Sequence, residues 1–129
     1  MYNYSRQRID TDRLPAAVTA KWPRPVLSEG FVPFPKRLLR CCTKIFPGEE
    51  GLEDLVVALA IVDYLRPSQT KLPSLSYLAF LAGMTPERYE VVLQRLVDRK
   101  LVRAEGQPDA LDVSISGLAS AIELAAAEG

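Results

Sequence analysis

The stretch that decides the fold is "LSYLAFLAGMTPERYEVVLQRLVDRKLV", residues 75–102. Its first part is rich in apolar residues and ends at Gly83, which can adopt the left-handed conformation that terminates many helices. Thr85 and Pro86 follow, and they suit the N-cap and the first position of a second helix. That helix is expected to reach about Arg99. The stretch therefore predicts two helices joined by a tight turn, the arrangement of a helix-turn-helix.

The residues that follow this stretch change to a period of two. Apolar and polar residues alternate over residues 101–105 and again over 111–115. Gly106 to Asp109 provides the turn between two short strands. Ser116 is then expected to cap a last helix over residues 117–127.

Two more helices are expected upstream. Pro35 suits the first turn of a helix over residues 36–46. The apolar positions of that helix share one face and are Leu38, Leu39, Cys42, Ile45 and Phe46. The next helix, residues 51–66, begins with Glu53 and Asp54, which complement its dipole. Its middle, "LVVALAIV", is apolar all round, and in so small a domain this predicts burial partly by another chain.

These elements predict a mainly α protein with a small β-hairpin. The expected architecture is a winged helix-turn-helix with a three-helix core, a wing, and extra N- and C-terminal helices. The domain prediction is a basic, proline-containing irregular arm over residues 1–30, a winged-helix domain over 31–116 and a C-terminal helix over 117–129.

Three segments of the chain together resemble a known family. They are "FVPFPKRLLRCCTKIF", "GLEDLVVALAIVDYL" and "LPSLSYLAFLAGMTPERYEVVLQRLVDRKLV". They are similar to the N-terminal winged-helix domain of the DnaD-type replication initiation proteins, over roughly residues 31–105. The resemblance implies replisome or primosome assembly, oligomerisation through this domain and contact with DNA. The family's second helical domain, which carries much of its DNA binding, has no counterpart within these 129 residues.

The composition excludes several classes of site. The chain has no histidine, which removes histidine-based catalysis and imidazole metal ligands. The two cysteines are adjacent and cannot supply four zinc ligands, and Cys42 is expected to be a small buried hydrophobe. No catalytic pair and no glycine-rich phosphate loop is present. We therefore expect no enzymatic activity, no cofactor and no metal.

No segment is apolar enough for a membrane partner. The longest apolar run, residues 55–62, falls well short of the roughly 20 residues that a membrane span requires. The first ten residues lack the apolar core of a signal peptide. The predicted location is the cytoplasm.

The net charge of zero hides an uneven distribution. Residues 1–48 hold nine Lys/Arg against three acidic residues, a net +6, and residues 49–129 have a net −6. A basic front half indicates an anionic partner, or association of the front of one chain with the back of another.

Candidate DNA contacts lie on two parts of the chain. On the second helix of the helix-turn-helix they are Arg88, Gln94 and Arg95, although Glu87 and Glu90 occupy much of the same face. In the basic front half they are Arg37, Arg40, Arg24 and Lys21, which would give nonspecific, salt-dependent binding.

A homodimer is also expected. The candidate interface residues are Trp22, Val57, Ile61, Leu118 and Ile122. Trp22 either pins the arm to the domain or anchors an interface.

Three functions remain open from sequence. The leading one is a DNA-replication-associated winged-helix protein that binds DNA weakly, acts as an assembly adaptor, or does both. The second is a protein-interaction or oligomerisation module that binds no DNA. The third is a transcriptional regulator of helix-turn-helix type.

Overall fold

A computed structural model describes residues 10–28, 32, 34–65, 74–107 and 110–128, and the chain divides into two compact units, residues 1–33 and 34–129. The described part of the first unit contains only short helical turns: η1 (Thr11–Arg13), α1 (Ala16–Thr19) and η2 (Arg24–Leu27). The predicted irregular arm therefore has local helical structure where it is described. Leu27 is its buried apolar residue.

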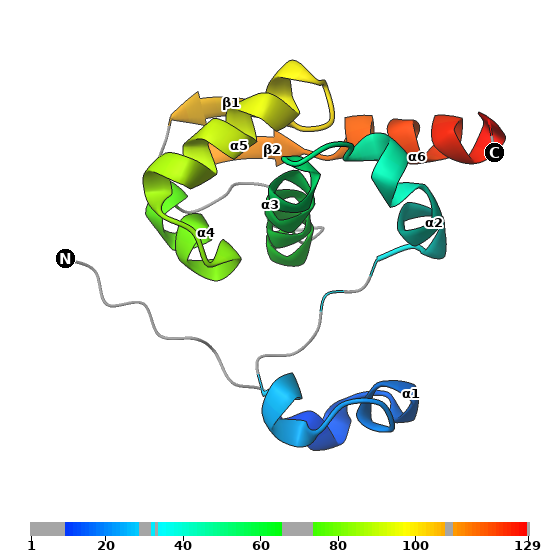
Figure 1. Ribbon diagram of the computed structural model, residues 1–129. Helices are drawn as coiled ribbons and strands as arrows, with labels where there is room; N and C mark the ends of the chain where they lie inside the picture. The colour runs from blue at the N-terminus through cyan, green and yellow to red at the C-terminus, as the bar shows by residue number, and fades with distance from the viewer. Residues whose placement is uncertain (1–9, 29–31, 33, 66–73, 108–109, 129) are drawn as a thin grey trace. The chain divides into compact units, whose positions relative to one another are not determined.

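The second unit is mainly helical with a small two-stranded antiparallel sheet (Figure 1). Its elements are α2 (Lys36–Ile45), α3 (Gly51–Tyr64), α4 (Leu75–Ala82), α5 (Pro86–Asp98), β1 (Arg103–Gln107), β2 (Ala110–Ser114) and α6 (Ser116–Glu128). In the sheet Ala104 lies opposite Val113. The tip of the predicted hairpin, residues 108–109, and the loop 66–73 lie outside the described residues.

The turn between α4 and α5 forms as its sequence predicts. Gly83 has φ +71°, and the backbone N–H groups of Gly83 and Met84 donate to the carbonyls of Phe80 and Ala79. This pair of bonds is a Schellman motif, which satisfies carbonyls that the end of the helix leaves open. Thr85 then caps α5 by accepting from the backbone N–H of Arg88 at 3.2 Å.

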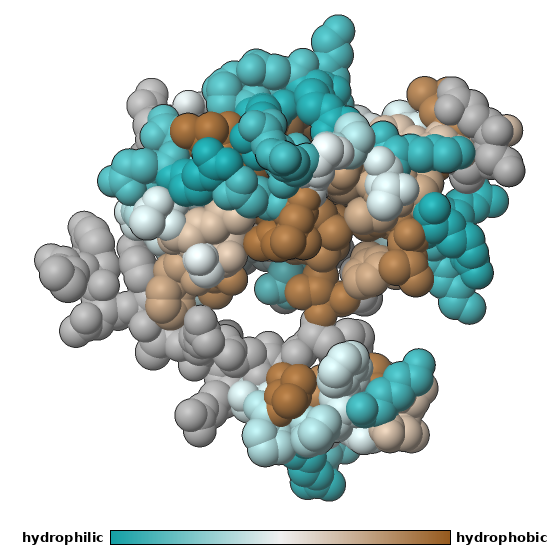
Figure 2. All heavy atoms as spheres, viewed as in Figure 1, coloured by the Kyte–Doolittle hydropathy of each residue, from teal (hydrophilic) through white to brown (hydrophobic). Residues whose placement is uncertain are grey.

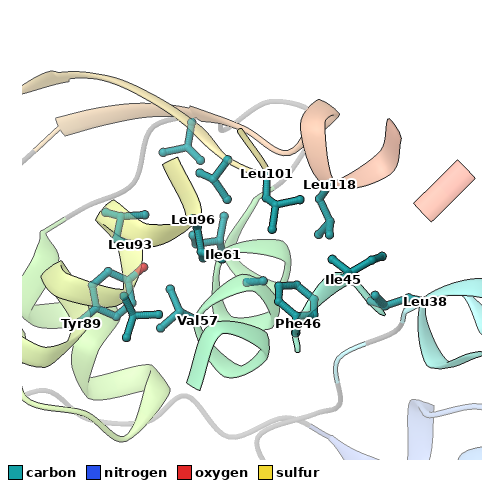
Figure 3. Packing of buried hydrophobic residues seen from close by; sticks show 14 of the residues in the cluster. Leu38, Ile45, Phe46, Val57, Ile61, Tyr89, Leu93, Leu96, Leu101 and Leu118 are labelled. Atoms are coloured by element: carbon teal, nitrogen blue, oxygen red, sulfur yellow. The ribbon is translucent and has the colours of Figure 1, made fainter. Parts of the chain in front are cut away.

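The core of the second unit lies around α3, which packs against α4 and α5. Its fully buried large side chains are Tyr89, Ile61, Leu78, Leu96, Val57 and Val92. Figure 3 shows Ile61 and Leu96 facing each other near the middle of this cluster, with Leu38, Ile45 and Leu118 at one end of it. A continuous apolar cluster of this kind is the main favourable contribution to folding.

The burial of α3 differs from the sequence prediction. Val57 and Ile61 are completely buried by helices of the same chain, so their burial requires no second copy. The less covered face of α3 is a different one, formed by Leu52, Val56 and Leu59. Leu52 is 72% exposed, and the other two are half-buried.

The face that α2 buries also differs in part from the predicted stripe. Leu38, Cys41 and Ile45 are buried, and α2 packs against α6. Cys41 lies inward and its thiol donates to the carbonyl of Arg37, whereas Cys42 is only half-buried. Leu39, which was expected to be buried, is 66% exposed.

Helix α6 is part of the second compact unit of the chain. Its first turn approaches the end of α5 closely, and the backbone N–H of Leu118 donates to the carbonyl of Leu101 at 2.9 Å. A Cβ at Gly117 would lie 1.9 Å from the carbonyl oxygen of Lys100. Glycine is therefore required there for this approach. None of the helices in the described residues has the length and apolar character needed to cross a bilayer.

Gly83 and Lys100 hold equivalent positions at the ends of α4 and α5, because Lys100 has φ +61° and begins a second Schellman motif with Leu101. Lys100→Gly should raise the free energy of unfolding by about 0.5–1 kcal/mol, since glycine avoids the Cβ penalty at positive φ. Gly83→Ala should lower it by a similar amount through backbone strain alone, because the new Cβ would meet no atom within 4 Å. Urea denaturation measures both. A Lys100→Gly variant less stable than wild type would contradict this account.

Tyr89 offers a second test of the core. Its ring is buried, and its hydroxyl has no hydrogen-bond partner among the described residues. Burial also raises the pKa of this phenol well above its ordinary value. Because an unpaired buried hydroxyl is destabilising, Tyr89→Phe should leave the melting temperature unchanged or raise it. A loss of stability above about 1 kcal/mol would show that the hydroxyl has a partner.

Candidate functional site

The outward side of α5 is the candidate site, because it is where a helix-turn-helix would contact DNA. It bears Glu87, Glu90, Val91, Gln94 and Asp98, which we call the acidic face of α5. With Arg95 these residues line a shallow hollow of about 420 Å³. Val91, near its middle, is 51% exposed. Figure 2 shows hydrophilic side chains gathered over α5.

Arg88, a predicted DNA contact, is paired with a carboxylate of α3. Its Nε donates to Glu53 Oε2 at 2.7 Å, and its Nη2 bonds the other carboxylate oxygen. The hydrogen bonds from Arg88 hold the pKa of Glu53 below its ordinary value. This stabilising contribution is therefore present at neutral pH and is lost as the pH falls through the lowered pKa.

Arg95, the second predicted arginine, is held more deeply. Its Nε and Nη2 donate to Asp54 Oδ1 at 2.9 and 2.5 Å, and its Nη1 lies 3.4 Å from Glu50. The Asp54 side chain is only 5% exposed. A buried carboxylate needs such partners, because an uncompensated buried charge is strongly unfavourable.

Arg99 extends this cluster to α2. Its Nη1 lies 3.9 Å from Asp54 Oδ2, and its Nη2 donates to the backbone carbonyl of Ile45. Ile45 ends α2, so Arg99 satisfies a carbonyl that the end of a helix leaves without an internal partner. The Asp54 carboxylate therefore connects the start of α3 to α5 and, through Arg99, to the end of α2.

Gln94 is also engaged. Its Nε2 donates to Asp98 Oδ1 at 2.9 Å, one turn further along α5. Each of the three α5 residues predicted to contact DNA thus already has a carboxylate partner. What α5 presents outward is negative charge around Val91.

The predicted contacts on α2 are arranged differently. Arg37 and Arg40, with Lys36 and Lys44, form the basic face of α2, and all four are exposed. Within the described residues no ion pair involves any of them. Two of these cations, Lys36 and Arg37, lie in the first turn, where the helix dipole disfavours positive charge. Like charges four residues apart also repel each other, which applies to the successive pairs among Lys36, Arg40 and Lys44. An anionic partner would relieve all of these interactions.

The remaining candidates lie in the first unit. Arg24 is paired with Asp12 at 2.5 Å, whereas Lys21 is exposed. Trp22 is 54% exposed. A half-exposed tryptophan is consistent with a contact surface, and that role stays a prediction.

The predicted interface residues do not form one surface. Val57, Ile61 and Leu118 are buried in the core, and Ile122 is half-buried against it. Only Trp22 of the predicted set is substantially exposed. These residues were predicted as an interface, three of them are buried within this chain, and the homodimer stays a prediction.

The cysteines show no sign of a reactive or metal site. Burial, followed by the effect of Cys41, raises the pKa of the Cys42 thiol, which keeps it protonated and less nucleophilic at neutral pH. Among the described residues, no three Cys, Asp or Glu side chains gather closely enough to hold a metal ion.

No family model matches the chain, and no curated protein or solved structure is significantly similar to it. The candidate surfaces therefore rest on this chain's own geometry. Two of their residues, Leu39 and Val91, were not predicted as contacts. A signal for Val91 was present, since it is an apolar residue among charged neighbours on the outward side of a helix.

Asp54 provides the test of this cluster. Asp54→Asn is expected to lower the free energy of unfolding by about 3 kcal/mol, because it leaves Arg95 and Arg99 without their buried carboxylate. Chemical denaturation with circular dichroism measures the change. The matched control is Glu53→Gln, which removes the same charge from the neighbouring residue but from a more exposed pair. Equal losses in the two variants would show that Asp54 is not the central carboxylate.

Proposed function

We propose that this chain is a winged-helix assembly adaptor, which binds other proteins through the acidic face of α5 and does not recognise DNA sequence. The order α4, turn, α5, β1 and β2 supports the winged-helix assignment. The resemblance to DnaD-type domains supports replication, or its regulation, as the setting. Cytoplasmic location is part of the same proposal.

One observation carries the proposal: both arginines of α5 are paired with carboxylates of α3. DNA carries a negative charge for about every 1.7 Å of helix axis, so a helix placed in its groove needs free donors or cations. The acidic face offers Glu87, Glu90 and Asp98 instead. Carboxylates around an exposed valine suit a protein surface that is basic and partly apolar.

A second candidate function is nonspecific nucleic-acid binding through the basic face of α2. Four exposed cations without carboxylate partners among the described residues favour it. If all four contacted phosphates, the log–log dependence of affinity on salt would have a slope of about −3.6. Such binding would position the protein on nucleic acid without reading its sequence.

Fluorescence anisotropy with labelled duplexes tests the first proposal. We expect no preference among duplex sequences at ~50 mM salt, and no effect of Gln94→Ala on any binding that is seen. Arg40→Ala is the matched comparison on α2 and should weaken nonspecific binding. A sequence-specific complex that Gln94→Ala abolishes would overturn the adaptor proposal.

Site-specific photocrosslinking gives the positive side of the same test. A crosslinker at position 91 should join the chain to protein in cells, whereas one at position 124 should not. Leu124 is a suitable control because it is also apolar and is similarly exposed, but lies on α6. Crosslinks from position 91 to DNA would contradict the proposal.

A further inference from the structure

Two exposed surfaces of the second unit are complementary. The basic face of α2 presents Lys36, Arg37, Arg40 and Lys44, with Leu39 exposed beside them. The acidic face of α5 presents three carboxylates around Val91. In addition, α2 contains no acidic residue, and the two arginines of α5 are already held by α3.

The two faces cannot satisfy each other within one unit. Helices α2 and α5 stand on different sides of it in Figure 1. The inner side of α2 packs against α6, while α5 packs against α3 and α4. Each face is therefore open to a separate molecule.

We propose that the acidic face of α5 in one copy binds the basic face of α2 in a second copy, head to tail. This inference rests on the proposed function, because it names the first protein partner of the acidic face. Opposite charge supplies the attraction and orientation, and Leu39, at the edge of the basic face, supplies an apolar contact for Val91.

An antiparallel arrangement of the two helices matches their residues. With a rise of about 1.5 Å per residue, placing Leu39 opposite Val91 sets Arg40 level with Glu90. Lys44 then falls within about 1.5 Å of the level of Glu87. Antiparallel helices also oppose their dipoles favourably.

The exposed Leu39 favours a protein partner for α2 over a nucleic acid. Phosphates are contacted by cations and polar donors, and a phosphate backbone offers nothing apolar to cover Leu39. The acidic face of α5 offers Val91 at the corresponding level. The cations that repel one another along α2 are relieved by the same contact.

Head-to-tail contacts leave one α2 face and one α5 face unused at the two ends of every open assembly. Such contacts produce rings when the rotation closes and open chains when it does not. The assembly should therefore grow with protein concentration. It should dissociate as salt rises from ~50 mM to ~500 mM, because exposed charges are then screened.

Light scattering on the full chain tests the contact with single charge reversals. Arg40→Glu and Glu90→Arg should each weaken self-association by roughly tenfold or more, since each sets like charges opposite one another. The controls are Arg103→Glu on β1 and Glu123→Arg on α6, which make the same charge changes at exposed positions elsewhere. Circular dichroism confirms that each variant is folded.

Mixing the variants gives the decisive result. In a mixture of Arg40→Glu and Glu90→Arg chains, the intact acidic face of the first meets the intact basic face of the second. We expect self-association to recover in the mixture, because the second contact, between the two reversed side chains, again sets opposite charges together. Two weakly associating variants that remain monomers when mixed would overturn the head-to-tail contact.

The other possible outcomes also test the head-to-tail contact. A wild-type monomer at low salt and high concentration would overturn this inference but leave the adaptor proposal intact, because that proposal is judged by DNA binding and crosslinking. Self-association equal in all four variants would place the contact elsewhere and overturn it. Binding of duplex DNA by α2 that leaves self-association unchanged would also overturn it, because the two ligands would have to compete.

Discussion

The buried carboxylate of Asp54 is the constraint from which the surface of this protein follows. It lies in the first turn of α3, where the helix dipole favours a negative charge, but it is almost completely removed from water. Its neutralisation by Arg95, with Arg99 nearby, fixes α5 against α3 and joins both to the end of α2. An ion pair of this kind adds little net stability over apolar residues of similar size, yet breaking it is strongly unfavourable. The pair is compatible with only one rotation of α5 about its axis, the one that also buries Tyr89, Val92 and Leu96.

That rotation decides which charges reach the solvent. With Arg88 and Arg95 directed at the acidic first turn of α3, the residues left outward on α5 are Glu87, Glu90 and Asp98. The two acidic residues in the first turn of α3, Glu53 and Asp54, are used in these same pairs and do not compensate α2. The four cations of α2 then remain exposed, and none of them has an ion-pair partner among the described residues. A chain whose total charge is zero therefore presents two surfaces of opposite sign, and the internal pairs between α3 and α5 are the cause.

Local sequence signals predicted much of the fold, and long-range pairing was beyond them. Gly83 and Thr85 act through residues within five positions along the chain, so the turn and the cap of α5 could be assigned from sequence. Glu53 and Arg88 are 35 residues apart, and a helical wheel gives a residue's direction but not its partner. The arginines were accordingly predicted as DNA contacts. Leu39 was assigned to the buried face of α2 for a related reason. A residue at the edge of an apolar stripe is buried only if a neighbouring helix reaches it. Here α6 packs against α2, and the buried side of α2 bears Cys41 and not Leu39.

The residues that hold the scaffold together differ from those that set the charge of its outward surface. Gly83, Ala79 and Tyr89 determine that α4 and α5 meet at this angle, and all three contribute through backbone conformation or burial. None of them touches the outward side of α5. Under the adaptor proposal a partner is selected by a few surface charges, each of which can change with little effect on folding because exposed pairs contribute little stability. Here the arginines that would favour DNA are paired with carboxylates of α3, and the carboxylates on the outward side of α5 oppose it. The turn between α4 and α5 therefore sets the shape of the outward surface, while the acidic first turn of α3 sets its charge.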